Sequence, residues 1–403
     1  MDTKLLIVAD DLTGGLDSGV QLAKQGVSVC VDPDPCAKKT LQRTNVQVLV
    51  AVCETRHLAP DAAYEAVYRV VSMGRQAGIP YVYKKTDSAL RGNIGAELAA
   101  ALKASGAATL HFFPAYPAMN RLTINGCQYI DGVPVSRSVF GNDPFDPVPE
   151  SDIRKLIERQ TEIPVIRGCE AGCRLICGNG DPTVPRRIFV MDGKSDEDLI
   201  EAGLKLKAAG ELSVSAGCAG FAAFLPELLD LEREALPDTH DLGNGLLVIS
   251  GSLNPITLKQ LDYAEKKGFV RNRPESLPEN FRSKNNEPLF NDPWMIIDSS
   301  GIQKHFPSCG SFHLKPDEDI LAYLALLFSE AEKKSDGTIM IIGGDTLSAC
   351  LRSIDIRQLR PVKELLPGVV LSAFVSEGRD KYIISKSGGF GDEELLVRLR
   401  GLK

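Results

Sequence analysis

The chain has 403 residues and a formal net charge of −7, with 43% hydrophobic and 25% charged residues. These values are typical of a globular protein of roughly two to three domains, and no long basic block points to nucleic acid as a partner. The N-terminal segment has no secretory signal and no run approaches the length of a membrane span, so we expect a cytoplasmic protein with no membrane partner.

Strand and helix patterns alternate along the first half of the chain. Strands are predicted over residues 4–10, 27–32, 46–52, 81–85 and 109–114, and a strand followed by a helix over 187–210. Helices are predicted over residues 17–26, 61–78 and 95–104. Turn signals at Asn125-Gly126 and Asp131-Gly132 predict a hairpin within 124–136. This alternation favours a mostly parallel sheet with helices on both faces.

A second α/β unit is expected after the acidic, proline-containing stretch 232–245. We therefore predict an N-terminal domain over 1–238 and a C-terminal domain over 239–403. The second unit has predicted strands within 246–251, 295–300, 337–346 and 375–391, and a predicted helix over about 317–333. Residues 270–293 are polar and are expected to form an exposed loop or insertion. The fold class is thus α/β, with two α/β domains.

The ten cysteines are scattered, which is typical of free thiols rather than of a disulfide framework. Cys169, Cys173 and Cys177 recur every four residues and would share one face of a helix. Because no fourth soft ligand has zinc-like spacing and no histidine is near, a packing face or loop is favoured over a metal or redox site.

Ligands of open α/β sheets bind beyond the carboxyl ends of the strands, so polar residues directly after a strand are candidates. The first such corner has Asp10 and Asp11, the pair Gly14-Gly15, and Asp17 near the expected helix start. Carboxylates accept hydrogen bonds from sugar hydroxyls, and one could act as a general base. Capping of the helix N-terminus explains the same acids without any ligand, and both interpretations stay open.

A second corner gathers cations, an acid and hydroxyls within ten residues of a strand end: Lys84, Lys85, Asp87, Ser88, Arg91 and Asn93. Arginine and lysine suit carboxylate or phosphate ligands. Gly92 and Gly95 suggest a close backbone approach, whereas a solvated charged loop is the alternative. Glu54 and Arg56 follow the preceding strand and are expected at the same edge.

Three glycine-containing corners occur in the second half, at residues 249–255, 341–348 and 385–392. Backbone N–H groups and hydroxyls at helix N-termini form anion sites, most often for phosphate. Three such corners favour a nucleotide, and a magnesium ion bridging its phosphates would need carboxylate help. "DGKS" at 192–195 resembles the end of a P-loop, but the first glycine would fall at Ile188, so no P-loop is present. Ser195 and Asp198 are interpreted instead as a capping box.

The order of several long motifs resembles that of the four-carbon acid sugar kinases. The motifs are "ADDLTGGLDSG" (9–19), "KKTDSALRGNIGAEL" (84–98), "FFPAYPAMNRLTINGCQYIDGVPV" (112–135), "FGNDPFDPV" (140–148), "AGCAGFA" (216–222), "SGSLNPIT" (250–257), "GGDTLSACL" (343–351) and "KSGGFG" (386–391). The resemblance implies a kinase that uses ATP and Mg²⁺ to phosphorylate threonate, erythronate or 3-oxo-tetronate, usually on the terminal hydroxyl.

The resemblance also implies a site on each domain. Its substrate-binding positions are Asp10, Asp11, Arg56, Lys85, Asp87, Ser88 and Arg91. Its nucleotide-binding positions are Ser250, Ser252, Gly343, Gly344, Asp345, Thr346, Gly388 and Gly389. Asp11, Asp87 and Arg91 are the expected catalytic residues, and no metal ligand is assigned. The carboxylates would hold the sugar hydroxyls, and the glycine turn would allow close approach.

Some residues depart from the family pattern while the core charges remain. They are Ala89, Asn120, Leu122, Cys218, Leu253, Asn254 and Gly389. These departures bear on which acid sugar is used. Two alternatives to the kinase stay open: another ATP-dependent enzyme acting on a small hydroxy acid, and a non-catalytic sensor of a sugar acid and a nucleotide. A homo-oligomer is also possible.

Overall fold

A computed structural model of the chain describes residues 2–35, 45–143, 146–168, 185–236, 245–277, 292–303, 318–334 and 337–402. The chain divides into two units, Met1–Leu236 and Pro237–Lys403, which are described separately below. The predicted boundary at 238/239 falls in residues outside the described part and stays a prediction. The same holds for the cluster Cys169, Cys173 and Cys177, which also lies outside the described residues.

The first unit is built on an eight-stranded sheet with the order β2-β3-β1-β4-β11-β5-β10-β9, in which every neighbouring pair is parallel. The strands are β1 (Leu5–Ala9), β2 (Val29–Asp32), β3 (Val48–Val52), β4 (Tyr81–Lys85), β5 (Thr109–Phe113), β9 (Val165–Arg167), β10 (Arg187–Val190) and β11 (Val214–Gly217). The neighbouring strands β1 and β3 are apolar and buried along their whole length, as expected for a parallel sheet that is covered on both faces.

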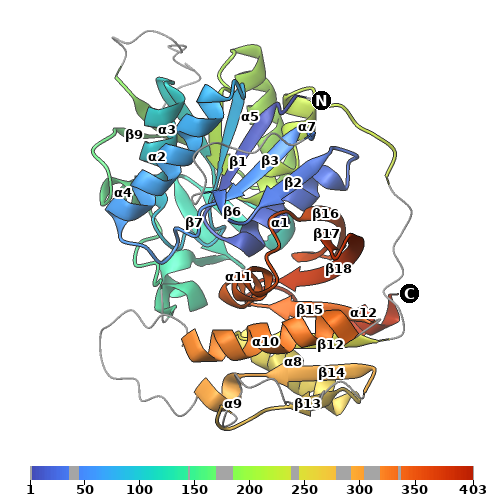
Figure 1. The fold of residues 1–403 in the computed structure, drawn as a ribbon. Coiled ribbons are helices and arrows are strands. Elements are labelled where there is room, and N and C mark those ends of the chain that lie inside the picture. The colour runs from blue at the N-terminus through green and yellow to red at the C-terminus, as the bar shows by residue number, and fades with distance from the viewer. Residues whose placement is uncertain are drawn as a thin grey trace. The chain divides into compact units, whose positions relative to one another are not determined.

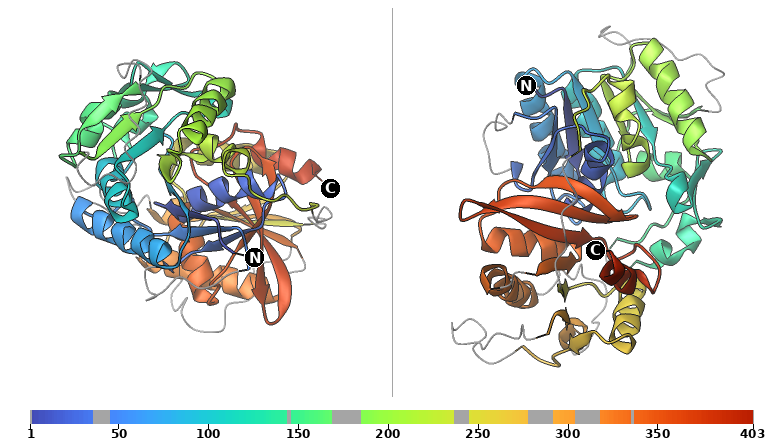
Figure 2. Two further views of the ribbon diagram at one scale, coloured as in Figure 1. Left: turned by 90° about the horizontal axis from the view of Figure 1, so that it is seen from above. Right: turned by 90° about the vertical axis from the view of Figure 1, so that its right-hand side faces the viewer.

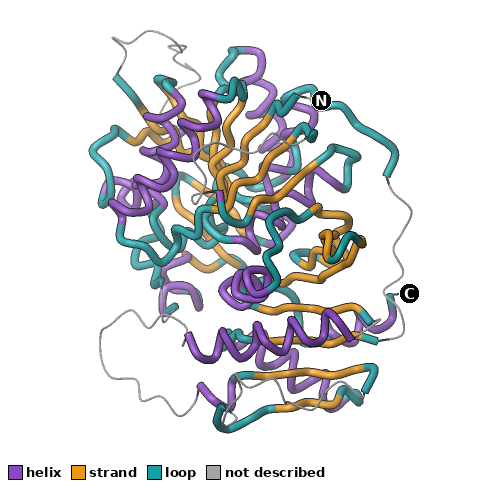
Figure 3. The backbone as a smooth tube through the Cα atoms, in the orientation of Figure 1, coloured by secondary structure: helices purple, strands orange, loops and turns teal. Residues whose placement is uncertain are grey.

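Helices alternate with these strands, as the sequence predicts (Figure 3). They are α1 (Leu12–Ala23), α2 (Pro60–Gln76), α3 (Ile94–Ser105), α4 (Ile153–Glu158), α5 (Asp196–Ala208), α6 (Ala219–Ala222) and α7 (Leu225–Leu228). One group of helices, α2, α3 and α4, packs together, and a second group contains α1, α5, α6 and α7 (Figure 1). The connections that contain α2 and α3 run along the sheet in one direction, and those that contain α1 and α5 run in the other. Because crossovers between parallel strands are right-handed, the two groups of helices lie on opposite faces of the sheet.

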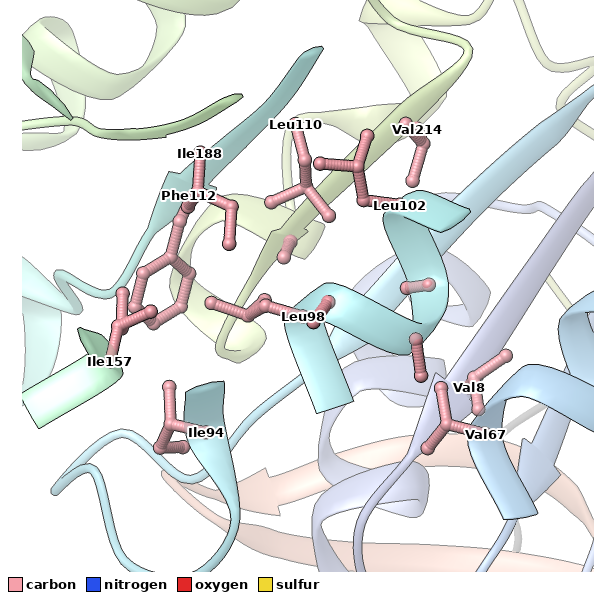
Figure 4. Close-up of a cluster of buried hydrophobic side chains, with 14 of the residues drawn as sticks. Val8, Val67, Ile94, Leu98, Leu102, Leu110, Phe112, Ile157, Ile188 and Val214 are labelled. Carbon is pink, nitrogen blue, oxygen red and sulfur yellow. The ribbon is translucent and has the colours of Figure 1, made fainter. Parts of the chain in front are cut away.

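The core between the sheet and α3 is a continuous layer of aliphatic and aromatic side chains. Figure 4 shows Leu98 and Leu102 of α3 in the same cluster as Leu110 and Phe112 of β5, and all four are fully buried. Ile157 of α4 joins this cluster. Burial of each such side chain contributes about 1.5–3 kcal/mol to the free energy of unfolding. This apolar layer therefore holds in place the strands from whose carboxyl ends the polar corners extend.

The first predicted helix begins earlier than the sequence indicates. Residues 17–26 were expected to be helical, but α1 starts at Leu12 and Asp11 is its N-cap, accepting a hydrogen bond from the backbone N–H of Gly14. Gly14 and Gly15 therefore lie within the helix rather than in a turn. Asp17, expected near the helix start, is a buried residue of the helix interior.

The predicted hairpin is confirmed as a small antiparallel sheet of β6 (Arg121–Ile124), β7 (Cys127–Ile130) and β8 (Val133–Pro134). Asn125-Gly126 and Asp131-Gly132 all have positive φ, as two-residue hairpin turns require. The capping box at Ser195 and Asp198 is also present at the start of α5. Ile188 lies inside β10, which agrees with the absence of a P-loop there.

The second unit has a seven-stranded mixed sheet with the order β13-β14-β12-β15-β18-β17-β16. The strands are β12 (Leu246–Ser250), β13 (Val270–Asn272), β14 (Trp294–Asp298), β15 (Thr338–Ile342), β16 (Arg360–Leu366), β17 (Val369–Ser376) and β18 (Arg379–Lys386). The first five strands of this order pair in parallel, whereas β17 is antiparallel to both of its neighbours (Figure 2).

The helices of this unit are α8 (Pro255–Lys266), α9 (Ser300–Gln303), α10 (Glu318–Lys334), α11 (Gly344–Ser353) and α12 (Leu395–Gly401). The helix predicted over 317–333 is thus confirmed as α10. The expected loop over 270–293 is wrong at its start, because Val270–Asn272 pairs with β14 as a short strand. Within the described ranges, no helix is both long enough and apolar enough to span a membrane.

Candidate functional site

Three charged corners of the first unit converge at one edge of its sheet. β3, β1 and β4 are neighbours and run in parallel, so their carboxyl ends lie side by side. Residues 10–11, 53–56 and 86–91 directly follow these ends. The chain leaves β1 through α1 toward β2 on one side, and reaches β4 through α2 on the other side. This is a topological switch point, where ligands of open α/β sheets bind.

Lys85 and the two adjacent aspartates form the centre of this cluster. The Nζ of Lys85 lies 2.8 Å from Oδ1 of Asp10 and 2.8 Å from Oδ1 of Asp11. Arg56 bridges the same two acids, with Nη2 2.6 Å from Oδ2 of Asp10 and 2.8 Å from Oδ1 of Asp11. The Oδ2 of Asp11 accepts a hydrogen bond from the Thr13 hydroxyl at 2.7 Å. Asp11 therefore caps α1, and Asp10 and Asp11 together hold two cations.

Asp87 and Arg91 form a second pair beside the first. Arg91 donates from Nε and Nη2 to the two oxygens of Asp87, each at 3.0 Å, which is the bidentate geometry of strong arginine–carboxylate pairs. The backbone N–H groups of Ala89 and Arg91 donate to the same carboxylate. Arg56 links the two pairs, because its Nη2 lies 3.6 Å from Oδ1 of Asp87. The structure thus brings Asp10, Asp11, Arg56, Lys85, Asp87 and Arg91 together.

The cluster fixes the charge of its members. Burial alone would raise the pKa of Asp11, but Arg56 and Lys85 outweigh it and hold that pKa well below its ordinary value. In the same way, Arg91 and Arg56 hold the pKa of Asp87 far below its ordinary value. Burial opposes the charge of Lys85, yet Asp10 and Asp11 raise its pKa. Both acids are carboxylates at neutral pH, so they are hydrogen-bond acceptors for a hydroxyl and weak proton acceptors.

The glycines of this region make room for the cations. A Cβ on Gly14 would lie 1.7 Å from Nζ of Lys85, so only glycine allows the ammonium to reach the N-terminal turn of α1. Gly92 has a φ of +84° and packs against Arg56. The close approach inferred at Gly95 is to another helix, because a Cβ there would lie 2.4 Å from the carbonyl of Ile157.

Two residues that the sequence groups with this corner serve to hold it in place. Successive side chains of a strand point to opposite faces of the sheet, so Lys84 lies on the opposite face from Lys85. There its Nζ lies 2.7 Å from Oε2 of Glu97 on α3. Both side chains are buried. Asn93 donates to the carbonyls of Thr55 and Leu58 at 3.0 and 2.8 Å and fastens the loop after β3.

Ser88 faces a residue that sequence reasoning did not single out, Arg121. The guanidinium of Arg121 donates to the Ser88 hydroxyl and is buried, with 5% of the residue exposed. Arg121 also lies over the ring of Phe140 on the short helix η4 (Val139–Asn142), with 5.5 Å to the ring centroid. Arg91 lies 5.2 Å from the centroid of the same ring. The sequence signal for Arg121 was its place inside the motif 112–135, shortly after the proline-containing turn that follows the buried strand β5.

Three loops of this edge contain left-handed backbone at a residue other than glycine. Glu54, Leu90 and Asn120 have φ values of 49°, 66° and 52°. Each lies one or two positions before one of the three buried or half-buried arginines, Arg56, Arg91 and Arg121. Such strain persists where surrounding contacts fix the backbone, and it clusters at functional sites.

The three glycine corners of the second unit also meet at one sheet edge. β12, β15 and β18 are consecutive, parallel neighbours, and each ends at one corner. A Cβ on Gly251 would lie 2.0 Å from Oγ1 of Thr346, and one on Gly388 would lie 2.4 Å from Oγ of Ser252. Gly343, with a φ of +113°, caps α11 and lies beside the same Thr346 hydroxyl.

The remaining predicted residues of this edge follow the same corners. Ser250 ends β12, and its buried hydroxyl has no hydrogen-bond partner among the described residues. Gly344 and Asp345 form the first turn of α11, and Gly389 lies in the turn after β18. All eight predicted nucleotide-side residues are therefore at the carboxyl edge of three adjacent strands.

Two side chains of α8 hold the corner after β18, residues 385–392, in place. Thr257 donates to the carbonyl of Gly388 at 2.8 Å, and Gln260 donates to the carbonyls of Phe390 and Asp392. The Nζ of Lys386 donates to the carbonyls of Ser387 and Gly388 at 2.8 and 3.3 Å. Burial lowers the pKa of Lys386 to about 7. Thr257, the last residue of the motif 250–257, therefore has a structural role at this corner.

The sequence patterns did not indicate a fourth corner of this edge, residues 298–300. Asp298 ends β14, next to β12, and accepts hydrogen bonds from the Ser300 backbone and hydroxyl, while Arg271 pairs with it at 2.6 Å. Its sequence, "IIDSS", has no glycine, so the glycine-containing pattern typical of phosphate-binding loops is absent there.

Comparison with known proteins identifies the class. Residues 5–225 match the family model for a sugar-binding N-terminal domain, and residues 309–396 match the model for a nucleotide-binding C-terminal domain. The first match covers more than half of the chain, and the chain belongs to this family. The resemblance that the motif series indicated is thereby confirmed.

The curated relatives are kinases of four-carbon acids. A D-threonate kinase of Salmonella typhimurium is 28% identical over 98% of this chain and 96% of its own. A D-erythronate kinase of Heliobacterium modesticaldum is 28% identical over 65% of this chain and 60% of its own. A 3-oxo-tetronate kinase of Pseudomonas fluorescens is 24% identical over 98% of this chain and 96% of its own.

Solved structures share the fold. A Salmonella typhimurium protein aligns with a TM-score of 0.73 at 19% identity over 99% of both chains. A Haemophilus influenzae protein aligns with a TM-score of 0.68 at 19% identity over 98% of this chain and 99% of its own.

Proposed function

We propose that this protein is an ATP-dependent kinase that phosphorylates a four-carbon acid sugar, namely threonate, erythronate or 3-oxo-tetronate, on its terminal hydroxyl. The observation that carries the proposal is the buried cluster of Asp10, Asp11, Lys85 and Asp87 at the switch point of a sugar-binding domain. Ionised acids held by fixed cations accept hydrogen bonds from hydroxyl groups, and the curated relatives are named as kinases of four-carbon acid sugars.

The first unit positions the acceptor hydroxyl. Phosphoryl transfer depends on alignment and charge neutralisation more than on covalent chemistry. Asp11 is the best-placed acid to orient the attacking hydroxyl: its Oδ1 accepts from Lys85 and from the backbone of Gly14, whereas its Oδ2 accepts from the small Thr13 hydroxyl. Asp87 keeps Arg91 in place. Arg91 and Lys85 then stabilise the negative charge of the phosphoryl group during transfer.

The glycine corners of the second unit fit a nucleotide polyphosphate. The N-termini of α8 and α11 supply backbone N–H groups, and Ser250, Ser252 and Thr346 supply hydroxyls. The described residues hold no group of three or more His, Cys, Asp or Glu side chains that could bind a metal by itself. Mg²⁺ is commonly bound through one or two carboxylates and the phosphates, so Asp345 would hold it with ATP, where it neutralises phosphate charge.

The test is an ADP-release assay with ATP and Mg²⁺ against both enantiomers of threonate and erythronate and their oxo derivatives. Turnover of one member, with the phosphate on the terminal carbon by NMR, is the expected result. Release of AMP, or a product other than a sugar phosphate, would point to another ATP-dependent enzyme. Binding of both ligands with no turnover would point to a sensor. The same preparation, analysed by light scattering, tests the predicted homo-oligomer, and fractionation of cells tests the predicted cytoplasmic location.

A further inference from the structure

The amine of Lys386 is buried beneath the turn after β18, and all of its contacts are neutral. Lys386 is 1% exposed, and its Nζ donates to the carbonyls of Ser387 and Gly388 at 2.8 and 3.3 Å. The same Nζ lies 3.5 Å from the Thr257 hydroxyl. Within the described part of the second unit, no carboxylate pairs with it. By contrast, the buried Lys85 of the first unit lies 2.8 Å from two carboxylates.

The elements around this amine present neutral side chains to it. Lys386 is in register with Ile342 of β15 and Val369 of β17. The helices α8 and α12 contribute apolar side chains, among them Leu261 and Leu396, to the core on this side of the sheet. The charged residues of α8, of α12 and of the turn before α12 are all exposed, and the hydroxyl of Tyr263 donates to one of them, Glu394; these charged residues are Lys259, Asp262, Glu265, Lys266, Asp392, Glu393, Glu394, Arg398 and Arg400.

One further acid lies at the same sheet edge. Asp345, in the first turn of α11, is half-buried at the neighbouring corner after β15. It does not offset the burial of Lys386, because burial is the cause that lowers the pKa of this amine to about 7. A negative charge brought close to the amine would therefore favour its protonated form.

The two carbonyl contacts of Lys386 fix the direction of two backbone N–H groups. In a trans peptide, the carbonyl of one residue and the N–H of the next point in opposite directions, and the described chain has no cis peptide bond. Since the carbonyls of Ser387 and Gly388 point toward the amine, the N–H groups of Gly388 and Gly389 point away from it. Neither N–H group has a hydrogen-bond partner among the described residues. Successive N–H groups of a turn can form a concave site for an anion.

This turn adjoins another glycine corner of the proposed nucleotide edge. A Cβ on Gly388 would lie 2.4 Å from Oγ of Ser252, which follows β12. Thr257 also donates to the carbonyl of Gly388, at 2.8 Å, so rotation of this peptide would break two hydrogen bonds. Resting on the proposed function, we infer that Lys386 is a positioning residue, which directs the N–H groups of Gly388 and Gly389 to the nucleotide phosphates and takes up a proton when the nucleotide binds.

The coupling has a defined sign because the phosphates favour the ammonium form. At pH 8, an amine with a pKa of about 7 is neutral in about nine of ten molecules of the free protein. Nucleotide binding at this pH therefore takes up at most about 0.9 proton, and affinity falls by at most about 10-fold per pH unit above pH 7. The nucleotide adds little to this uptake, because a phosphate with a second pKa of about 6 is already ionised at pH 8.

The test counts protons by isothermal titration calorimetry of the full-length protein. ATP with Mg²⁺, and no acceptor, is titrated at pH 8 in two buffers that differ in their enthalpy of ionisation. We expect wild type to take up about 0.5–0.9 proton per nucleotide. Lys386→Met should take up less than about 0.1 proton, and at pH 7 it should bind ATP about 10-fold more weakly.

Two further variants separate this role from a general structural one. Lys266→Met removes an exposed lysine from the last turn of α8 and should match wild type in both affinity and proton uptake. Lys386→Gln keeps an N–H donor for the two carbonyls but has no titratable charge. It should take up no proton while binding ATP more tightly than Lys386→Met, and it replaces that variant if Lys386→Met fails to fold by circular dichroism.

Wild-type binding of ATP without proton uptake, or equal uptake by wild type and the Lys386 variants, overturns the inference while the kinase stands. A wild-type protein that does not bind ATP at pH 7 overturns the proposed use of ATP, and the inference with it.

Discussion

The two units share a strand arrangement but differ in the chemistry at its switch point. The order β2-β3-β1-β4 in the first sheet corresponds to β13-β14-β12-β15 in the second, with all pairs parallel. Beyond β1 and β4 lie paired acids and bases, whereas beyond β12 and β15 lie glycines, hydroxyls and helix N-termini. The topology determines where a ligand can bind, and the side chains determine which ligand.

The difference matches the two ligands of the proposed reaction. A small polyhydroxy acid offers a few hydroxyls and one carboxylate, so it needs side chains at fixed positions. A polyphosphate is long and highly charged, and backbone N–H groups can follow it without adding buried charges. In the first unit, the buried charged side chains must therefore neutralise one another even when no ligand is bound.

The largest expected effect therefore comes from breaking the charge cluster. Lys85→Met leaves Asp10 and Asp11 facing each other with Arg56 as their shared counter-charge. We expect a loss of about 3–5 kcal/mol in the free energy of unfolding, measured by urea titration, and loss of turnover. Lys205→Met, which removes an exposed lysine paired with Glu201 on α5, should cost less than about 0.5 kcal/mol. Equal stability of the two variants would contradict the assigned role of the cluster.

The two candidate catalytic acids should separate kinetically. Asp11→Asn is expected to lower kcat by about 10²- to 10⁴-fold with a modest change in KM, because an orienting acceptor acts in the transition state. Asp87→Asn is expected mainly to raise KM, because it releases Arg91. Initial rates over a range of acid-sugar concentrations measure both, and full activity in both variants would remove these acids from the mechanism.

In the second unit, the sharpest test is the buried amine of Lys386. Its pKa is about 7 in the folded state, below the ordinary value of about 10.4. Between these values the unfolded chain binds more protons than the folded one, so stability should rise as pH increases from 7 toward 10. The slope from this one group is at most about 1.4 kcal/mol per pH unit. Urea unfolding at pH 7 and pH 9 should show a smaller pH dependence for Lys386→Met than for wild type, and equal slopes would contradict the prediction.

The smallest expected effect lies far from either corner. Ser195→Ala removes the capping box of α5 and should cost about 1 kcal/mol of stability, seen as a lower melting temperature. Its kcat and KM should equal those of wild type. A kinetic defect in Ser195→Ala would mean that activity follows general stability rather than the two corners.

Sequence patterns predicted the strands and the corners well because buried parallel strands are strongly apolar and the polar residues follow them directly. The start of α1 was not predictable in this way, since two glycines at the front of a helix contradict local propensity. Tertiary packing decides there, because Lys85 and the side chain of Val52 occupy the space of the missing Cβ atoms of Gly14 and Gly15. Arg121 escaped notice for a related reason: its partner Ser88 is distant in sequence, and no local pattern pairs them.

Gly14 has no functional group, yet it borders the ammonium of Lys85 so closely that the two positions form one steric unit. A lineage of this family that acquired a side chain at position 14 would have to shorten or redirect the residue at position 85 in the same step. The two positions should therefore covary, and a search for divergent substrate preferences could begin with chains in which both have changed.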